Sequence, residues 1–304
     1  MSEYVLQTFD LTKTYARKNA VDHINLKIRK GDIYGFIGKN GAGKTTTIKM
    51  VVGLITPSSG EIELFGSDDL QKGRKKSGTV IESPAYYPYL NARQNIEVQR
   101  IMKGVKDKSI TDELLTVVGL ENAGRKKAKN FSLGMKQRLA IALALVGDPE
   151  FLFLDEPING LDPAGIKDVR ELVLKLSKEA GITIMISSHI LGELSKIATC
   201  YGIINDGKLV DQFTTEELQE RVKPHIKLTV NDPEKAISVL KEKMGISSLE
   251  VQDNSVIIYQ ILDKSVEINK VLEENEIIVQ FISKEEGDYE NYFIKLMEGG
   301  SIND

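Results

Sequence analysis

Residues 38–45 limit the possible folds of this chain more than any other segment. They read Gly-Lys-Asn-Gly-Ala-Gly-Lys-Thr and fit the pattern G-x-x-x-x-G-K-[ST]. The glycines allow a tight turn whose N–H groups point at an anion, and the helix expected next directs its positive end to the same place. Lys44 can reach the β- and γ-phosphates of a nucleotide, and the Thr45 hydroxyl can ligate Mg²⁺. We therefore expect triphosphate contacts from Gly38, Asn40, Gly41, Ala42, Gly43, Lys44, Thr45 and Thr46.

Two acids, Asp155 and Glu156, directly follow the apolar segment 151–154. In an open α/β sheet, ligands bind at the carboxyl ends of the strands. This position would let Asp155 hold Mg²⁺, directly or through water, and let Glu156 orient or deprotonate a water that attacks the γ-phosphate. The alternative is a strand end with two solvated acids, and the phosphate-binding pattern upstream argues against it.

Composition narrows the class of protein further. The chain has 304 residues, of which 41% are hydrophobic and 28% charged, as in a soluble globular protein of about two domains. The longest apolar runs are shorter than the roughly 18–20 residues of a membrane helix, and the first ten residues, MSEYVLQTFD, do not resemble a secretory signal. A single cysteine, Cys200, excludes an internal disulfide and a cysteine-cluster metal site. We therefore expect an intracellular protein.

Hydrophobic periodicity divides the chain into two domains. Residues 1–222 alternate apolar strands with helices, which predicts an α/β domain, and the stretch 83–147 within it is predominantly helical. The pattern of apolar residues changes at residue 223. Over 223–304 it predicts the order β-α-β-β-α-β, which is a small ferredoxin-like α+β domain, with a last helix at 289–297.

The net charge of −4 is unevenly spread, because residues 225–304 hold 8 Lys against 16 Asp and Glu. This asymmetry has two equally good explanations. It arises by chance, or the two parts of the chain have different surroundings. A nucleic-acid partner is not expected, because no basic run is interleaved with aromatic residues.

The order of five motifs resembles the ATPase subunits of ATP-binding cassette (ABC) transporters over about residues 3–220. These motifs are the phosphate loop, Ser132-Leu133-Gly134-Met135-Lys136-Gln137-Arg138, Asp155-Glu156, Gly160-Leu161-Asp162 and His189. The resemblance implies a P-loop NTPase cassette with a RecA-like core, an antiparallel β-subdomain and a helical subdomain that carries the serine motif. It also implies binding of ATP with Mg²⁺ and hydrolysis of ATP.

The resemblance assigns further residues by position. Tyr15 matches the aromatic residue that stacks on adenine, although a surface aromatic is the plain alternative. Ser132 and Gly134 match residues that touch the γ-phosphate held by a second cassette, and Ser132 alone could equally be a helix cap. Asp162 matches an acid that supports the dimer interface. His189 matches the histidine that contacts the γ-phosphate and acts with Glu156 and Lys44 in catalysis, unless it is structural.

The sequence departs from the family pattern at two places. The usual Leu-Ser-Gly-Gly-Gln is Phe131-Ser132-Leu133-Gly134-Met135 here, which retains the serine and the second glycine but puts the finer interface contacts in doubt. Glu82 stands where the family usually has glutamine. Its carboxylate can bind Mg²⁺ or water but cannot donate as an amide does; a solvated surface glutamate is the alternative.

The Glu82-Ser83-Pro84 loop and the serine motif resemble the branch of bacterial exporters for bacitracin-like peptides and lantibiotic immunity. That resemblance implies a membrane permease partner, a second ATPase subunit (the same chain or a paralogue) and a cytoplasmic location, peripheral on the inner face of the membrane. Tyr86, Tyr87 and Tyr89 form either the docking surface for the permease or a small core of the helical insert. A soluble ABC ATPase and an ATP-sensing regulator are the competing functions.

Overall fold

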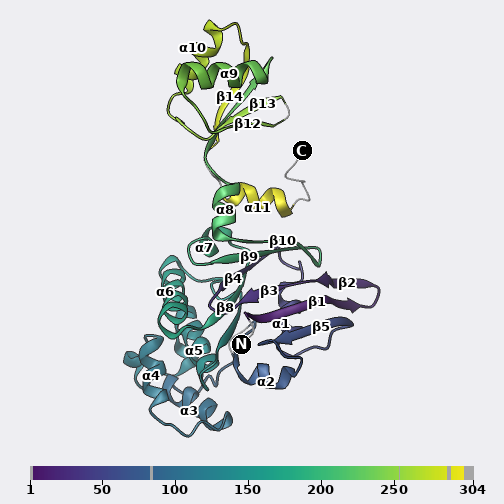
Figure 1. The fold of residues 1–304 in the computed structure, drawn as a ribbon. Coiled ribbons are helices and arrows are strands. Elements are labelled where there is room, and N and C mark those ends of the chain that lie inside the picture. Colours follow the sequence, from purple (N-terminus) through teal and green to yellow (C-terminus); the bar gives the residue numbers. More distant parts are fainter. Residues whose placement is uncertain (1–2, 83–84, 253, 286–288, 298–304) are drawn as a thin grey trace. The chain divides into compact units, whose positions relative to one another are not determined.

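The computed structural model describes residues 3–82, 85–252, 254–285 and 289–297. Its contacts divide the chain into two compact units (Figure 1). Unit 1 runs to Thr215 and includes the end of the last helix from Ile294, and unit 2 is Glu216–Phe293. The contacts therefore divide the chain before residue 222 and return part of the last helix to the first unit, whereas the sequence pattern favoured a boundary at 222/223.

Unit 1 contains an antiparallel sheet in which β1 pairs with three strands. The strands are β1 (Tyr4–Tyr15), β2 (Lys18–Ile24), β3 (Lys27–Arg29) and β5 (Ser59–Leu64). Apolar residues such as Leu6 and Leu11 on β1 and Ile24 on β2 are fully buried in the core of this unit. This sheet is the antiparallel β-subdomain that the resemblance implies.

A second sheet of six strands, in the order β10-β9-β4-β8-β7-β6, forms the centre of unit 1. Its members are β4 (Ile33–Ile37), β6 (Ser77–Val80), β7 (Phe151–Asp155), β8 (Thr183–Ser188), β9 (Cys200–Asn205) and β10 (Lys208–Thr214). All neighbours are parallel except β10 and β9. Every residue of β4, β7 and β8 is buried, as expected for parallel strands covered on both faces. The carboxyl ends of these three strands therefore meet at one edge of the sheet.

Helices complete unit 1 around this sheet (Figure 1). They are α1 (Lys44–Val51), α2 (Leu70–Lys75), α6 (Pro163–Ala180) and the short α7 (Leu191–Leu194). The sequence pattern did not predict α2 or β6. Helix α2 is short and mostly polar. Its Gly73 is needed because a Cβ at this position would lie 2.4 Å from Cβ of Leu64.

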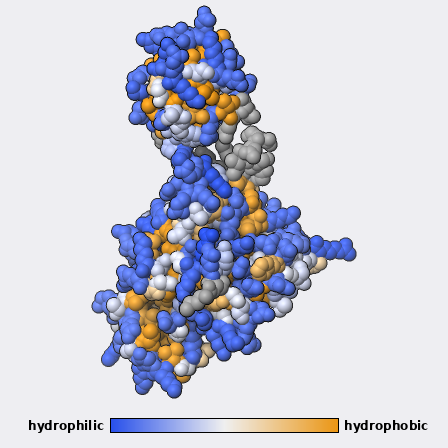
Figure 2. All heavy atoms as spheres, viewed as in Figure 1, coloured by the Kyte–Doolittle hydropathy of each residue, from blue (hydrophilic) through white to orange (hydrophobic). Residues whose placement is uncertain are grey.

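The stretch 85–147 is helical, as predicted; residues 83 and 84 lie outside the described part. Its α-helices are α3 (Ala92–Met102), α4 (Ile110–Val117) and α5 (Leu133–Leu145), with 3₁₀ turns η1 (Glu121–Ala123) and η2 (Ala128–Asn130). A capping box of Asn91 and Gln94 starts α3. Apolar surface is visible in the region of this insert in Figure 2. Ile101 and Met102 at the end of α3 are exposed.

Unit 2 has a core of its own, which includes Leu228, Leu240 and Leu272. Its six central elements are β11 (His225–Val230), α9 (Pro233–Met244), β12 (Leu249–Gln252), β13 (Ser255–Ile258), α10 (Ser265–Glu274) and β14 (Val279–Glu285). The strands pair antiparallel in the order β12-β13-β11-β14, so that each β-α-β crossover spans one intervening strand. The order of elements is the one that the sequence predicts, and Ile277, just before β14, is buried in the core.

Two helices join the units along the chain, α8 (Thr215–Arg221) and α11 (Tyr289–Met297). Within unit 2, Arg221 Nη1 donates to the hydroxyl of Tyr292 at 3.1 Å. Within unit 1, Asn205 Nδ2 donates to the carbonyl of Met297 at 2.9 Å. None of the helices in the described ranges is both long and apolar enough to cross a membrane.

Candidate nucleotide-binding site

The site begins at the loop between β4 and α1, whose backbone only glycine tolerates at several positions. Gly41 and Gly43 have φ of +84° and +112°, in the left-handed region. A Cβ at Gly38 would lie 2.4 Å from the carbonyl oxygen of Ile204. The glycines of the pattern are thus required by the turn itself, and α1 starts directly behind it at Lys44.

Lys44 is folded back over this loop. Its ammonium donates to the carbonyls of Gly38 at 2.7 Å and Lys39 at 3.2 Å, and the side chain is 5% exposed. The same Nζ lies 3.2 Å from Oε1 of Glu156. A buried ammonium is stable only when paired and hydrogen-bonded, as it is here. The loop between β4 and α1 therefore holds one buried positive charge.

Asp155 lies beside Thr45. The Thr45 hydroxyl donates to Asp155 Oδ2 at 2.7 Å, and the Ser187 hydroxyl donates to Asp155 Oδ1 at 2.5 Å. Asp155 is 2% exposed. A carboxylate and a hydroxyl oxygen are ligands that Mg²⁺ accepts, and Mg²⁺ typically takes its other ligands from water and phosphates. This donor set fits Mg²⁺, and within the described ranges no cluster of three or more His, Cys, Asp or Glu side chains forms a complete protein cage for a metal.

Glu156 and His189 form the third part of the site. His189 Nδ1 lies 2.8 Å from Glu156 Oε2. The backbone of Glu156 has φ of +50°, unusual for a residue with a side chain, and its N–H donates to the Ser187 hydroxyl at 2.9 Å. Such backbone strain persists only where the surrounding structure holds it. Lys44, Glu156 and His189 thus form one connected polar group at the carboxyl ends of β4, β7 and β8.

Ser187 is the residue of this site that sequence reasoning missed. It is fully buried at the end of β8 and serves both acids at once, as a donor to the Asp155 carboxylate and an acceptor from the Glu156 N–H. The only signal in the sequence was its place two residues before His189.

The serine motif lies next to Asp162. Ser132 caps α5 by accepting from Met135 N–H at 3.2 Å, and Asp162 caps α6 by accepting from Gly165 N–H at 3.0 Å. A Cβ at Gly134 would lie 3.7 Å from Cα of Gly165, so the starts of the two helices are adjacent. Among the described residues, no hydrogen bond or ion pair connects Ser132 or Gly134 with the phosphate loop of the same chain.

Tyr15 and Glu82 lie outside this polar group. Tyr15 ends β1, is 50% exposed, and has the Lys13 ammonium 5.3 Å from the centre of its ring. Glu82 follows β6 in the left-handed region, with φ of +57°. Its carboxylate pairs with Lys49 of α1 at 2.5 Å and is well exposed. Glu82 is therefore connected to the helix behind the phosphate loop rather than to Asp155.

Comparison with known proteins identifies the family of the chain. A sequence model of the ABC transporter family matches residues 21–159. The chain is 43% identical to the bacitracin transport ATP-binding protein BcrA of Bacillus licheniformis, over 98% of this chain and 99% of that protein.

The chain belongs to the ABC transporter ATP-binding proteins.

Other members of the family are similar over different lengths. BcrA of Enterococcus faecalis is 41% identical over 99% of this chain and 98% of its own length. The lantibiotic transport ATP-binding protein SrtF of Streptococcus pyogenes is 43% identical over 68% of this chain and 89% of its own. The similarity to BcrA therefore includes unit 2.

Solved ABC cassettes share the fold. The ATP-binding cassette MJ0796, in a dimeric post-hydrolysis state with ADP and phosphate, has a TM-score of 0.63 at 26% identity, over 69% of this chain and 98% of its own. CbiO1 of Clostridium perfringens has a TM-score of 0.65 at 25% identity, over 80% of this chain and 97% of its own. This ABC ATPase accordingly combines the RecA-like core, antiparallel sheet and helical insert that its sequence implies.

Proposed function

We propose that this chain is the ATP-hydrolysing subunit of an exporter that carries a peptide antibiotic of the bacitracin or lantibiotic class through a separate membrane permease. The full-length similarity to two bacitracin transport proteins and the similarity to a lantibiotic transport protein support this substrate class. These relatives favour an exporter over a soluble ATPase or an ATP-sensing regulator. In this proposal the protein lies at the cytoplasmic face of the membrane, bound to its permease.

The connected group of Lys44, Glu156 and His189 is the observation that carries the catalytic part of the proposal. The loop N–H groups and Lys44 hold the β- and γ-phosphates, and Gly38, Asn40, Gly41, Ala42, Gly43 and Thr46 complete the cradle. Glu156 orients the attacking water or accepts a proton from it. His189 holds Glu156 in place and contacts the γ-phosphate. Mg²⁺, held by Thr45 and Asp155 and approached by Glu82, would neutralise charge that develops on the phosphates.

The remaining predicted residues act between two cassettes. Ser132 and Gly134 would contact the γ-phosphate bound by a second subunit, with Asp162 supporting the interface and Tyr15 stacking on adenine. The absence of any described bond from Ser132 to the phosphate loop of its own chain is consistent with this arrangement. Since ATP would contact both subunits only when they are closed, binding favours closure and hydrolysis releases it.

The permease would dock beside the loop that follows Glu82. Tyr87 and Tyr89 are 52% and 67% exposed, so they do not form a core of the insert. Exposed aromatic residues suit a protein partner.

The replacement Glu156→Gln tests the catalytic assignment. We expect ATP binding to persist and turnover to fall by at least about a hundredfold, because loss of general-base catalysis costs about 10²–10⁴-fold. ATP-dependent dimers should then accumulate in size-exclusion chromatography. The control Lys44→Ala should lose turnover and dimers together. Unchanged turnover in Glu156→Gln would remove Glu156 from catalysis.

A further inference from the structure

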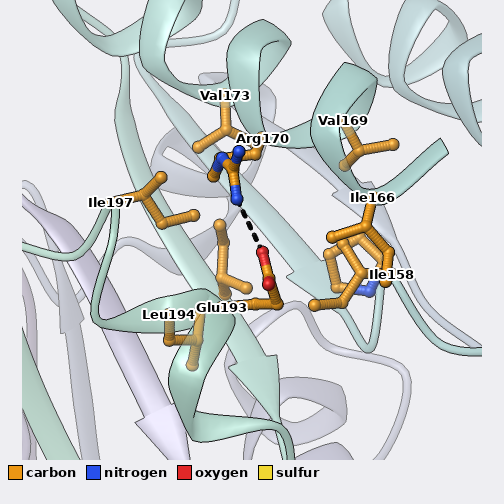
Figure 3. Close-up of a pocket in the computed structure, with 10 residues that line it drawn as sticks. Ile158, Ile166, Val169, Arg170, Val173, Glu193, Leu194 and Ile197 are labelled. Carbon is orange, nitrogen blue, oxygen red and sulfur yellow. Dashed lines mark hydrogen bonds and ion pairs between the residues drawn. The ribbon is translucent and has the colours of Figure 1, made fainter. Parts of the chain in front are cut away.

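A half-buried ion pair connects α6 with the short helix that follows His189. Arg170 Nη1 of α6 lies 2.8 Å from Glu193 Oε2 of α7, and the two side chains are 24% and 21% exposed. Figure 3 shows Arg170 pointing from α6 toward Glu193 across a gap between the two elements. A hydrogen bond from Lys196 and the nearby charge of Arg170 keep the pKa of Glu193 below its usual value, so the carboxylate is charged at neutral pH.

The gap around this pair is a packed apolar seam rather than a ligand site. Its free volume is about 10 Å³, which is at the lower limit for one water molecule. The lining comes from the loop after Glu156, from α6, from β8 and from the segment after His189, and includes Ile158, Val169, Val173, Ile186, Leu194 and Ile197. A closely packed lining transmits a shift of one element to its neighbours.

Few other bonds fix the segment that carries His189. Helix α7 has only four residues, and the hydrogen bonds of 190–197 are otherwise local, such as Ile190 N–H to the Ser188 hydroxyl. Among the described side chains of this segment, Glu193 alone has a hydrogen bond to a distant element. Leu194, 1% exposed, supplies the packing anchor. Beyond strand β8 before it and its own contact with Glu156, the segment that carries His189 is therefore held by one apolar contact region and one ion pair.

We infer that Arg170 and Glu193 are a positioning pair that holds His189 against Glu156 and connects it to the helix that begins at Asp162. Because Asp162 caps α6 and Arg170 lies on the same helix, a displacement of α6 reaches the His189 segment through this pair. The inference rests on the proposed catalytic roles of Glu156 and His189. It adds that Glu156 and His189 act only when the Arg170–Glu193 ion pair is in place, although this pair contacts neither the nucleotide nor the reacting atoms.

Steady-state ATP hydrolysis by the full chain with Arg170→Met gives the first test. Methionine keeps the apolar stem and removes the charge. We expect kcat to fall about tenfold with KM for ATP changed less than twofold, because small displacements of catalytic groups cost this much or more. Arg170→Lys should stay closer to the parent protein, and Glu193→Gln should show a smaller loss in the same direction. The control Arg93→Met removes an exposed pair with Asp112 on the insert and should change neither constant.

The ring of His189 gives a second readout that does not depend on turnover. The chain has three histidines, His23, His189 and His225, so the His189 imidazole signal in an NMR spectrum can be assigned by its loss in His189→Gln. Arg170→Met should shift this signal and leave the other two in place, and Arg93→Met should shift none.

Several results would overturn the inference. They are an unmoved His189 signal in Arg170→Met, a loss of kcat that Arg93→Met shares, and an increase of KM as large as the fall in kcat. Full turnover in both Glu156→Gln and His189→Gln would instead reject the proposed catalytic roles. Loss of turnover in those two variants with an unaffected Arg170→Met would reject the positioning pair alone.

Discussion

At the scale of single residues, buried hydroxyl groups determine how the acids of the site are placed. The sequence motifs predict that the lysine of the phosphate loop lies near the acids at the strand end, because both the loop and the end of the apolar strand can be recognised in the sequence. Ser187 shows what they do not predict. A serine has no periodicity or charge to mark it, yet here it bonds both Asp155 and the strained backbone of Glu156. Such partners become visible only when the pairing of β7 with β8 brings them together.

Replacing Ser187 by Ala should therefore affect catalysis as well as stability. It removes one of the two hydroxyl groups that donate to the Asp155 carboxylate and leaves the Glu156 N–H with only the Ser187 carbonyl at 3.2 Å. Because a buried hydrogen bond to a charged group is lost, we expect the free energy of unfolding to fall by about 1–3 kcal/mol. ATP turnover should fall about tenfold, which corresponds to about 1.4 kcal/mol in the activation barrier.

Thr183→Val is the matched control on the same strand. The Thr183 hydroxyl is also fully buried and accepts from the Gly31 N–H at 2.9 Å, but it lies at the opposite end of β8. Denaturant unfolding should show a comparable loss of stability, while turnover per folded molecule stays at the parent value. Equal turnover losses in the two variants would mean that Ser187 acts through stability alone.

At the scale of elements, the sequence predicts best the parts whose burial is complete. The apolar segment 151–154 forms β7 with one further residue, because a parallel strand covered on both faces is a continuous apolar run. Elements that lie at an edge were missed: β6 has only the four residues Ser77–Val80, and α2 is short and polar. Their positions are determined by pairing with β7 and packing on β5, which no local pattern encodes.

Glu82 after β6 gives a prediction at this scale. Its ion pair with Lys49 connects α1 to the loop that enters the insert, but the Glu82 side chain is 61% exposed. Exposed pairs contribute about 0–1 kcal/mol, so Glu82→Ala and Lys49→Met should each change the free energy of unfolding by no more than that. Because we propose that the carboxylate approaches Mg²⁺, turnover should fall severalfold in Glu82→Ala and persist in Lys49→Met. A similar fall in both variants would assign the effect to the ion pair instead of to the carboxylate.

At the scale of the whole molecule, the chain combines two units with separate hydrophobic cores. The sequence predicted two domains, because the pattern of apolar residues changes near residue 223. The apolar residues of 289–297 predicted a helix but did not indicate which core it would join, so the return of the chain to the first unit after Phe293 was not predicted. Only the contacts of Asn205 with Met297 and of Arg221 with Tyr292 assign the two ends of that helix.

Separate cores predict separate responses to nucleotide. ATP with Mg²⁺ binds the folded first unit only, so at a concentration 100 times its Kd it should stabilise that unit by about 2.7 kcal/mol. In differential scanning calorimetry of Glu156→Gln, which does not consume the ATP, one transition should move to higher temperature and one should stay. Leu228 is fully buried in the core of unit 2, and Leu228→Ala should lower only the transition that ATP leaves in place, since such a truncation costs about 2–5 kcal/mol. If nucleotide and Leu228→Ala instead shift one common transition, the two units unfold as a single cooperative body, and unit 2 then contributes directly to the stability of the ATPase.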